Sequence, residues 1–361
     1  MRLCTPDYYH AFTCIADKCE DTCCEAWEVV VDEDTALRYS ACTAPIGEKL
    51  RAYLHHDGED HIFRLKNGRC PFLRQDRLCE IHAAIGEENL CRTCALYPRH
   101  IEEFGDRREM GLGLSCPEAA RLVMAHTEPI TFPVVNIDED PDDEVDLDGR
   151  LYFSLFTARK TAFAIAQDRS YSIPERSALL LTFTRRIQRL MDRRHIGDIL
   201  PLAADFLHRD VQKRALNKCR KMSAADPMPA IISAYRTLEI LTPRWEETLA
   251  DLSNSKFGAA FGKTHGYENY LVYWIFRYFL KAVYDRELLF RMQWGVSGLA
   301  LLLLWDSCTE NLTDALQADH MHLFSRETEH CEENIATLRD LALTQAFSEE
   351  SLCSLLLPLP L

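Results

Sequence analysis

The chain has 361 residues, of which 47% are hydrophobic and 27% charged, so wholesale disorder is excluded and two domains of ordinary size fit within its length. Its formal net charge of −15 disfavours a general nucleic-acid binder, because neutralising phosphates needs a basic surface. No basic and apolar leader precedes Cys4, and the longest uncharged stretch of the C-terminal half, residues 294–305, is too short to cross a membrane. We therefore expect a cytoplasmic protein without a membrane span.

The first 128 residues are predicted to form a small α+β domain. Residues 27–32 contain three adjacent valines and favour a strand, and residues 62–65 are a second candidate, followed by an Asn67-Gly68 turn signal. Short helices are predicted over residues 34–39, 81–90 and 117–126. Such a chain has little regular core of its own and often depends on a metal for folding.

An acidic linker is expected at residues 129–150. The run from Glu128 to Pro133 cannot continue a helix, and residues 138–148 hold eight carboxylates and no basic side chain. More than half of the net charge therefore lies in this segment. A field of this sign attracts a basic partner, such as a protein with accessible lysines.

The remainder, residues 151–361, is predicted to be helical. Pro174 stands where the first turn of a helix tolerates proline, and the residues after it form an apolar stripe at helical spacing. Amphipathic stretches are expected at 151–168, 174–190, 229–241, 245–252, 267–294, 296–305 and 331–347. The expected fold class is thus mainly α, with a small cysteine-rich α+β metal-binding domain before a helical C-terminal domain.

Cysteines are concentrated in the first domain. Eleven of the 15 lie between Cys4 and Cys116, and in a reducing compartment such a cluster is more often a metal site or a catalytic centre than a disulfide framework. Two residues between thiolates let both sulfurs turn toward one ion, as in Cys91-x2-Cys94. The candidate ligands are Cys14, Cys19, Cys23, Cys24, Cys70, Cys79, Cys91, Cys94 and Cys116. We interpret the four later cysteines as core or surface thiols.

The kind of metal is open at this point. Thiolate ligands suit both zinc and iron-sulfur clusters, and His82 is a candidate to complete a mixed zinc site. Adjacent Cys23 and Cys24 cannot easily bind one mononuclear ion, so either one is spare or the site holds several metal atoms. Nucleotide-binding glycine loops, the nucleophile elbow and the His-Glu-x-x-His helix are absent from the sequence.

Five motifs of the first domain resemble the flagellin lysine-N-methylase family. They are Cys19-x3-Cys23-Cys24-x2-Trp27-x-Val-x-Val-Asp32, Gly68-Arg-Cys70-Pro-Phe-Leu73, Leu78-Cys-Glu-Ile-His82, Leu90-Cys-x2-Cys94-x2-Tyr97-Pro-Arg99 and Leu114-Ser-Cys116-Pro-Glu118. The cysteine-rich half is also similar to a broader group of small bacterial domains proposed to chelate zinc or iron. Tyr267-Glu-Asn-Tyr270 and the aromatic helix after it extend the resemblance over most of the chain.

The resemblance implies transfer of methyl groups from S-adenosylmethionine to lysine ε-amines of flagellin, with a cysteine-bound 4Fe-4S cluster needed for activity. Carried over residue by residue, it implies ligands among Cys19, Cys23, Cys24, Cys70, Cys79, Cys91, Cys94 and Cys116. One four-iron cluster needs only about four thiolates, so half of these are surplus or belong to a second site.

The chemistry of lysine methylation points to aromatic residues. A lysine amine is nucleophilic only when neutral, and an aromatic, partly desolvated channel lowers its pKa and attracts the sulfonium of the donor. Tyr267, Glu268 and Tyr270 are the catalytic candidates, and Tyr273 and Trp274 are candidates for binding the donor. An aromatic stripe at helical spacing is, however, also typical of a core.

Tyr97 and Arg99 are further candidates for binding the donor. Because they follow the Cys91-x2-Cys94 pair directly, we favour support of the metal ligands over a direct substrate role for them. The alternative function for the whole chain is a non-catalytic zinc- or iron-binding, redox-sensing module whose helical domain recruits a protein partner.

Overall fold

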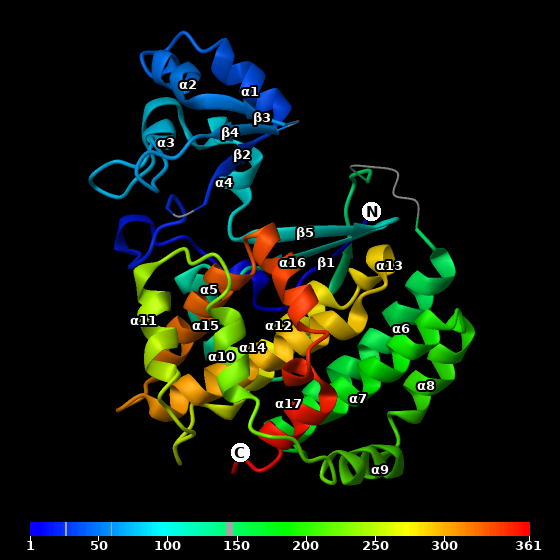
Figure 1. Ribbon diagram of the computed structural model, residues 1–361. Helices are drawn as coiled ribbons and strands as arrows, with labels where there is room; N and C mark the ends of the chain where they lie inside the picture. The colour runs from blue at the N-terminus through cyan, green and yellow to red at the C-terminus, as the bar shows by residue number, and fades with distance from the viewer. Residues whose placement is uncertain (26, 59, 142–146) are drawn as a thin grey trace.

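A computed structural model describes residues 1–25, 27–58, 60–141 and 147–361. It confirms the expected fold class: most of the chain is helical, and the cysteine-rich N-terminal part combines short helices with small sheets (Figure 1). Residues 142–146 of the expected acidic linker lie outside the described residues.

A four-stranded sheet combines the start of the chain with strands from residues 99–112 and 134–136. Its order is β5-β6-β1-β7, from strands β5 (Arg99–Phe104), β6 (Arg107–Leu112), β1 (Arg2–Cys4) and β7 (Val134–Asn136). Strand β1 runs parallel to β6 and antiparallel to β7. Residues 134–136 of the expected linker are therefore an edge strand. The division of the chain into independently folding domains stays a prediction.

A smaller lobe stands on top of this sheet in Figure 1. We call residues 23–96 the cysteine-rich lobe and the other described residues the body. The lobe has an antiparallel sheet of β2 (Val29–Val31), β4 (Asp60–Phe63) and β3 (Leu54–Asp57), in the order β2-β4-β3. Its helices are α1 (Glu33–Ser40), α2 (Gly47–Tyr53), α3 (Glu80–Ile85) and α4 (Arg92–Leu96).

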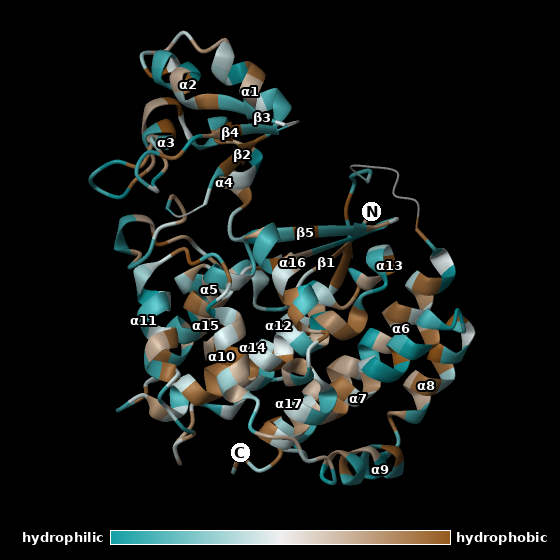
Figure 2. Cartoon of the chain, viewed as in Figure 1, coloured by the Kyte–Doolittle hydropathy of each residue, from teal (hydrophilic) through white to brown (hydrophobic). Residues whose placement is uncertain are grey.

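The body is built mostly from helices longer than those of the lobe, and most of them carry both polar and apolar residues (Figure 2). They are α5 (Pro117–Ala125), α6 (Gly149–Ala166), α7 (Ile173–Asp192), α8 (Ile199–Asp205), α9 (Arg209–Cys219), α10 (Met228–Tyr235), α11 (Pro243–Leu252), α12 (Thr264–Tyr278), α13 (Ala282–Asp285), α14 (Leu288–Cys308), α15 (Asp314–Thr328), α16 (Glu332–Leu341) and α17 (Glu349–Leu356).

Local signals explain where several of these helices begin. Helix α7 has a capping box in which Ser172 and Glu175 each accept from the other's backbone N–H, and Pro174 lies in its first turn, as expected. Asp148 caps α6 by accepting from the Leu151 N–H.

One helical stretch differs from the expectation. Residues 267–294 are divided into α12, α13 and the start of α14, because Arg286 adopts a left-handed conformation with φ of 62° and ends α13. Helix α14 then continues through Gly295, where we placed a break between two stretches. A Cβ at Gly295 would lie 2.4 Å from the Trp274 ring, so the glycine lets two helices approach closely.

Two separate hydrophobic cores stabilise the chain. The larger one combines the body helices with Tyr8, Tyr9, Phe12 and Phe104 of the N-terminal region. The smaller one lies within the lobe, around Val31, Leu50, Phe63 and Phe72, and cysteines are packed against it.

Helix α14 crosses the middle of the larger core. Among the described residues it is the one helix long and apolar enough to cross a membrane, and 89% of its most apolar window is buried inside the fold. Burial of this kind is what the central helix of a globular core shows.

Candidate metal centre and buried polar junction

The structure sorts the nine candidate cysteines into two groups. The lobe cysteines are Cys23, Cys24, Cys70, Cys79, Cys91 and Cys94, which are close enough to influence one another's ionisation. The body cysteines are Cys14, Cys19 and Cys116, which interact in the same way among themselves.

Backbone contacts bring the lobe cysteines together from three distant segments. The Cys70 N–H donates to the Cys24 carbonyl at 2.8 Å, and Leu73 forms an isolated β-bridge with Cys79. Cys79 and Cys91 immediately precede helices α3 and α4. Cys24, Cys79 and Cys94 are half-buried against the lobe core, of which Cys70 and Cys91 are part.

Asp32, the last residue of the first motif, positions the Cys91-x2-Cys94 helix. One carboxylate oxygen caps α1 by accepting from the Thr35 N–H at 3.1 Å, and the other accepts from the Arg92 N–H at 2.8 Å. A single carboxylate thus holds the first turns of two helices, one of which begins directly after Cys91.

Backbone N–H groups point at several candidate sulfurs. Burial raises the pKa of Cys79, while N–H groups of His82 and Ile81 lower it. Two effects also compete at Cys70. Burial raises its pKa to about 11, and the hydrogen bond from the Phe72 N–H lowers it in part. Amide hydrogen bonds to sulfur are a regular feature of thiolate metal centres, where they tune the cluster.

The Cys91 and Cys94 thiols at the start of α4 influence each other's ionisation. The Cys94 thiol lowers the pKa of Cys91, and the Cys91 thiol raises that of Cys94. The two sulfurs of the Cys-x2-Cys pair therefore face one point, as the spacing predicts.

The body cysteines lie at the start of α5. Burial raises the pKa of Cys116 to about 12, although hydrogen bonds from the Ala119 and Glu118 N–H groups at the start of the helix lower it in part. Arg121 of α5 pairs with Glu20, which neighbours Cys19. Cys14 is exposed and Cys19 half-buried.

The candidate ligands are of the type that binds a soft metal, but in the described residues their side chains are not arranged around one ion. Nine thiols and several amide donors to sulfur are the ligands that zinc and iron-sulfur clusters use. Within residues 1–25, 27–58, 60–141 and 147–361, no three His, Cys, Asp or Glu side chains are placed to hold one ion. His82 is exposed on α3.

The three catalytic candidates on α12 are buried and hydrogen-bonded within the body. Tyr267 donates to Asp306 at 2.6 Å, and Tyr270 donates to the Gly295 carbonyl at 3.1 Å. Glu268 is paired with Arg176 at 2.7 Å and with Arg169 at 2.9 Å. These contacts are those of core residues, and a catalytic role for the three stays a prediction.

Tyr273 and Trp274 lie further along the same helix. The Trp274 indole donates to the Arg291 carbonyl at 2.7 Å and packs edge-on against Trp294. Tyr273 donates to Glu329 at 2.6 Å and is buried in the same core.

The Glu329 carboxylate interacts with three hydrogen-bond donors. Besides Tyr273, its Oε2 accepts from Tyr278 at 2.6 Å and lies 3.3 Å from the Arg277 guanidinium. Burial and the Glu329 charge raise the pKa values of both tyrosines, so they stay protonated. The second oxygen of Glu329, Oε1, is buried without a hydrogen-bond partner.

A second set of side chains continues from Glu329 toward the cysteines. His330 bonds Ser115 at 2.7 Å through Nε2, and Ser115 also accepts from the Tyr97 hydroxyl at 3.2 Å. The Trp27 ring lies between Tyr97 and His330, with ring centroids 5.8 and 5.2 Å away. His330 is exposed, so this set reaches the surface there.

Tyr97 lies between the two cysteine groups. Burial raises its pKa strongly, and the charges of Cys116 and Cys23 add to the effect. Its hydroxyl also donates to the Ser115 carbonyl at 2.8 Å, next to Cys116. Arg99 begins β5 and covers the rings of Tyr9 and Phe12. Tyr97 is thus near the sulfurs, whereas Arg99 is turned to the body core.

Helix α15 ties the Cys23-Cys24 segment to the body. Arg326 donates to the carbonyls of Thr22 at 3.0 Å and Glu25 at 2.8 Å, and His322 bonds Asp21 at 2.9 Å. The Arg326 guanidinium also stacks 4.3 Å over Trp27.

We call this assembly the buried polar junction; its members are Trp27, Tyr97, His100, Ser115, Tyr273, Arg277, Tyr278, Arg326, Glu329 and His330. Several of its polar atoms are buried without a partner: both ring nitrogens of His100, Nε of Arg326 and Oε1 of Glu329. Unpaired buried polar atoms are costly, and their clustering is characteristic of a site that binds something.

Sequence reasoning missed most of this junction. Arg326, Glu329 and His330 recur at helical spacing, but the residues between them, such as Glu327 and Thr328, are polar as well, so spacing does not single them out. Gly111 is a second missed residue: a Cβ there would lie 2.4 Å from the His100 ring, so glycine leaves room for this histidine.

Comparisons with known proteins agree with the resemblance in the motifs. The family model of the FliB lysine N-methylase C-terminal domain matches residues 159–355. Lysine-N-methylases of Salmonella typhimurium and Salmonella choleraesuis are each 27% identical over 133 residues, covering 33% of this chain and 31% of the relative. The flagellar biosynthetic protein FliU of Salmonella muenchen is 27% identical over 133 residues, covering 33% of this chain and 75% of FliU.

The match thus spans less than a third of the length of the two lysine-N-methylases. No solved structure matches the chain.

Proposed function

The chain belongs to the family of the FliB lysine N-methylase C-terminal domain, and on this premise we propose that it transfers methyl groups from S-adenosylmethionine to lysine ε-amines of flagellin. The observation that carries the proposal is the family match over residues 159–355, which includes α12, α15 and most of the buried polar junction. Membership in a methylase family supports methyltransferase activity, and the donor and the protein substrate are the finer parts of the proposal.

The junction is the proposed place of methyl transfer. A lysine ammonium must lose a proton before it attacks the donor methyl, and the unpartnered Oε1 of Glu329 is a buried acceptor for it. The rings of Trp27, Tyr97 and Tyr273 offer π-faces to the sulfonium. Exposed His330 marks the side from which a lysine side chain enters.

We also propose that the cysteines hold an iron-sulfur cluster. The lobe cysteines Cys70, Cys79, Cys91 and Cys94, with Cys23 or Cys24, would hold it, and the amide groups that point at these sulfurs support them in this role. When bound, such a cluster would link α3, α4 and the Cys23-Cys24 segment through its thiolate ligands. Zinc at the same thiols is the alternative.

Methyl transfer is tested with anaerobically purified protein, flagellin and S-adenosylmethionine. Flagellin should gain mass in steps of one CH2 group. Replacing Glu329 with Gln should slow the initial rate by at least about a hundredfold, the range expected for loss of a general base. Tyr235→Phe is the matched control, because Tyr235 is a buried, hydrogen-bonded tyrosine outside the junction. An unchanged flagellin mass would leave the non-catalytic metal-binding module as the better explanation.

The metal is tested by its spectrum and by iron, sulfide and zinc analysis. A brown protein with iron and sulfide is expected. The double change Cys91→Ser and Cys94→Ser should remove the colour, whereas Cys42→Ser should keep it, since Cys42 packs against the same core but is not a candidate ligand. A colourless protein with stoichiometric zinc would overturn the iron-sulfur assignment.

A further inference from the structure

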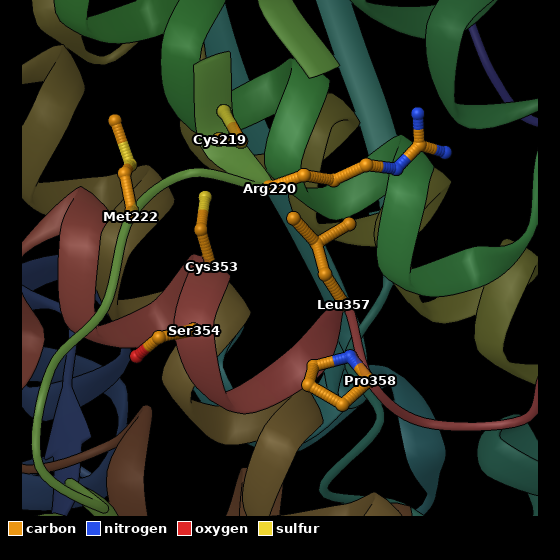
Figure 3. A pocket seen from close by; sticks show the side chains of 7 residues that line it. All are labelled: Cys219, Arg220, Met222, Cys353, Ser354, Leu357 and Pro358. Atoms are coloured by element: carbon orange, nitrogen blue, oxygen red, sulfur yellow. The ribbon is translucent and has the colours of Figure 1, made fainter. Parts of the chain in front are cut away.

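Two cysteines far from the metal candidates meet at the opposite end of the body. Cys219 is the last residue of α9 and Cys353 lies in α17; both helices pack against α7. Figure 3 shows the Cys353 side chain pointing toward the end of α9 that carries Cys219. From the sequence alone, 134 positions apart, the pair looks like two unrelated core thiols.

The two thiols line one hollow and are not equivalent. The neighbouring Cys353 thiol lowers the pKa of Cys219, whereas the Cys219 thiol and burial raise that of Cys353. The Thr182 hydroxyl also contacts the Cys219 sulfur at 3.3 Å. Charged groups close by are Glu349, which raises the pKa of Cys219, and Arg185, which lowers it. Cys219, which the Thr182 hydroxyl contacts, is therefore the more acidic thiol of the pair.

A hollow of about 270 Å³ lies over the pair. Both cysteines line it, together with Met222, Ser354 and Leu357 (Figure 3). Each cysteine is nevertheless at most 1% exposed, so the sulfurs form the floor of the hollow. A molecule the size of water or hydrogen peroxide can reach a sulfur at such a floor, whereas a bulky disulfide cannot present its S–S bond there.

We propose that Cys219 and Cys353 form a peroxide-reactive dithiol that closes to a disulfide, a modification site separate from the cysteine-rich lobe. The Cys219 thiolate attacks one oxygen of hydrogen peroxide, which breaks the O–O bond and yields a sulfenic acid and, after protonation, water. The Cys353 thiol then attacks the sulfenic sulfur, forming the S–S bond and releasing a second water. Two thiols are oxidised and one peroxide is reduced to two waters.

The Cys219–Cys353 disulfide would join α9 to α17 across the face of α7. The helix pairs α7–α9 and α7–α17 already pack together, so the bond links elements that are neighbours in the reduced protein. Because it closes a long loop, it restricts the unfolded chain and raises the thermal midpoint of the body.

The test treats the anaerobic, reduced protein with hydrogen peroxide in modest excess and maps its peptides by mass spectrometry. A linked Cys219–Cys353 peptide, two hydrogen atoms lighter than the reduced pair, is expected. Cys353→Ser should stop the reaction at a sulfenic acid on Cys219 that dimedone traps, and Cys219→Ser should leave Cys353 untrapped. Glutathione disulfide should react at this pair about tenfold or more slowly than at exposed Cys308.

Three outcomes would overturn the proposal: no linked peptide while Cys308 is oxidised, trapping at Cys353 instead of Cys219, or equal reaction of the pair with glutathione disulfide. The wild-type peptide map does not depend on whether the serine variants fold. The proposal also stands apart from the methyl transfer, since neither residue belongs to the junction or to the metal candidates.

Discussion

In the body, Trp245, Trp274 and Trp294 are each at most 2% exposed and pack within one continuous core that includes most helices. Among the described residues of the cysteine-rich lobe, by contrast, the core has eleven buried members, two of which are cysteines. A core of that size offsets little of the conformational entropy of the lobe's loops. The body is therefore stabilised by burial, whereas the proposed metal would supply much of the stability of the lobe.

Removal of the metal should have the largest effect and should act on the lobe. Binding free energies of structural thiolate sites are on the order of 10 kcal/mol, which is more than a small core supplies. Chelation under anaerobic, reducing conditions should make residues 23–96 sensitive to protease while the helical circular dichroism of the body persists. Equal protease resistance with and without metal would remove the distinction between the two regions.

Breaking a buried ion pair should destabilise the body next most strongly. Arg159 contacts both oxygens of Glu109, at 2.6 and 2.7 Å, and both side chains are at most 4% exposed. Arg159→Met leaves the carboxylate with Arg107 alone and should cost about 3–5 kcal/mol of unfolding free energy. Urea unfolding measures this, and a loss below about 1 kcal/mol would contradict the expectation.

Close helix packing should make Gly295 the next most sensitive position. An alanine Cβ would meet the Trp274 ring at 2.4 Å, so Gly295→Ala should cost about 1–3 kcal/mol. Gly149→Ala is the matched helical control, because nothing lies within 4 Å of its added Cβ. Equal stability of the two variants in urea would show that α12 and α14 are less tightly packed than the structure indicates.

Alkaline pH should act on the body through Cys4, a cysteine that is not a metal candidate. Burial raises the pKa of Cys4 from 9.0 to about 11. Because the folded pKa is raised, its contribution is fully present below pH 9 and is lost as the pH rises toward 11. Between pH 8 and 10, the wild type should lose about 1 kcal/mol more than Cys4→Ala in urea unfolding with reductant. Identical losses would refute this.

A surface pair should have the smallest effect. Arg2 and Asp106 are 2.7 Å apart, but their side chains are 51% and 71% exposed. Arg2→Ala should change the unfolding free energy by less than about 1 kcal/mol. A larger loss would mean that the edge of the four-stranded sheet depends on this pair.

Local signals were sufficient to predict the fold class, the short strands near residues 29–31 and 60–63, and the start of α7. Each of these depends on neighbouring residues: adjacent valines, a turn dipeptide or a proline in the first turn of a helix. The break at Arg286 and the continuity of α14 through Gly295 were not predictable, because they depend on contacts between helices.

For the candidate site, spacing predicted that Cys91 and Cys94 face one point but not that the nine cysteines divide into two groups. Cys70 meets Cys24 through a backbone bond between segments more than 40 residues apart, which no local pattern encodes. Glu329 was missed for the same reason, since its donors come from α12.

The sequence by itself determined the class of the protein: its cysteine spacing and its aromatic helix are properties of neighbouring residues, and both resemble one methylase family. Only the tertiary structure decided which cysteines lie together, that α15 joins the lobe to the body, and that Cys219 contacts Cys353. The physical reason is that these contacts join side chains far apart in the chain, and burial selects them only when the helices pack.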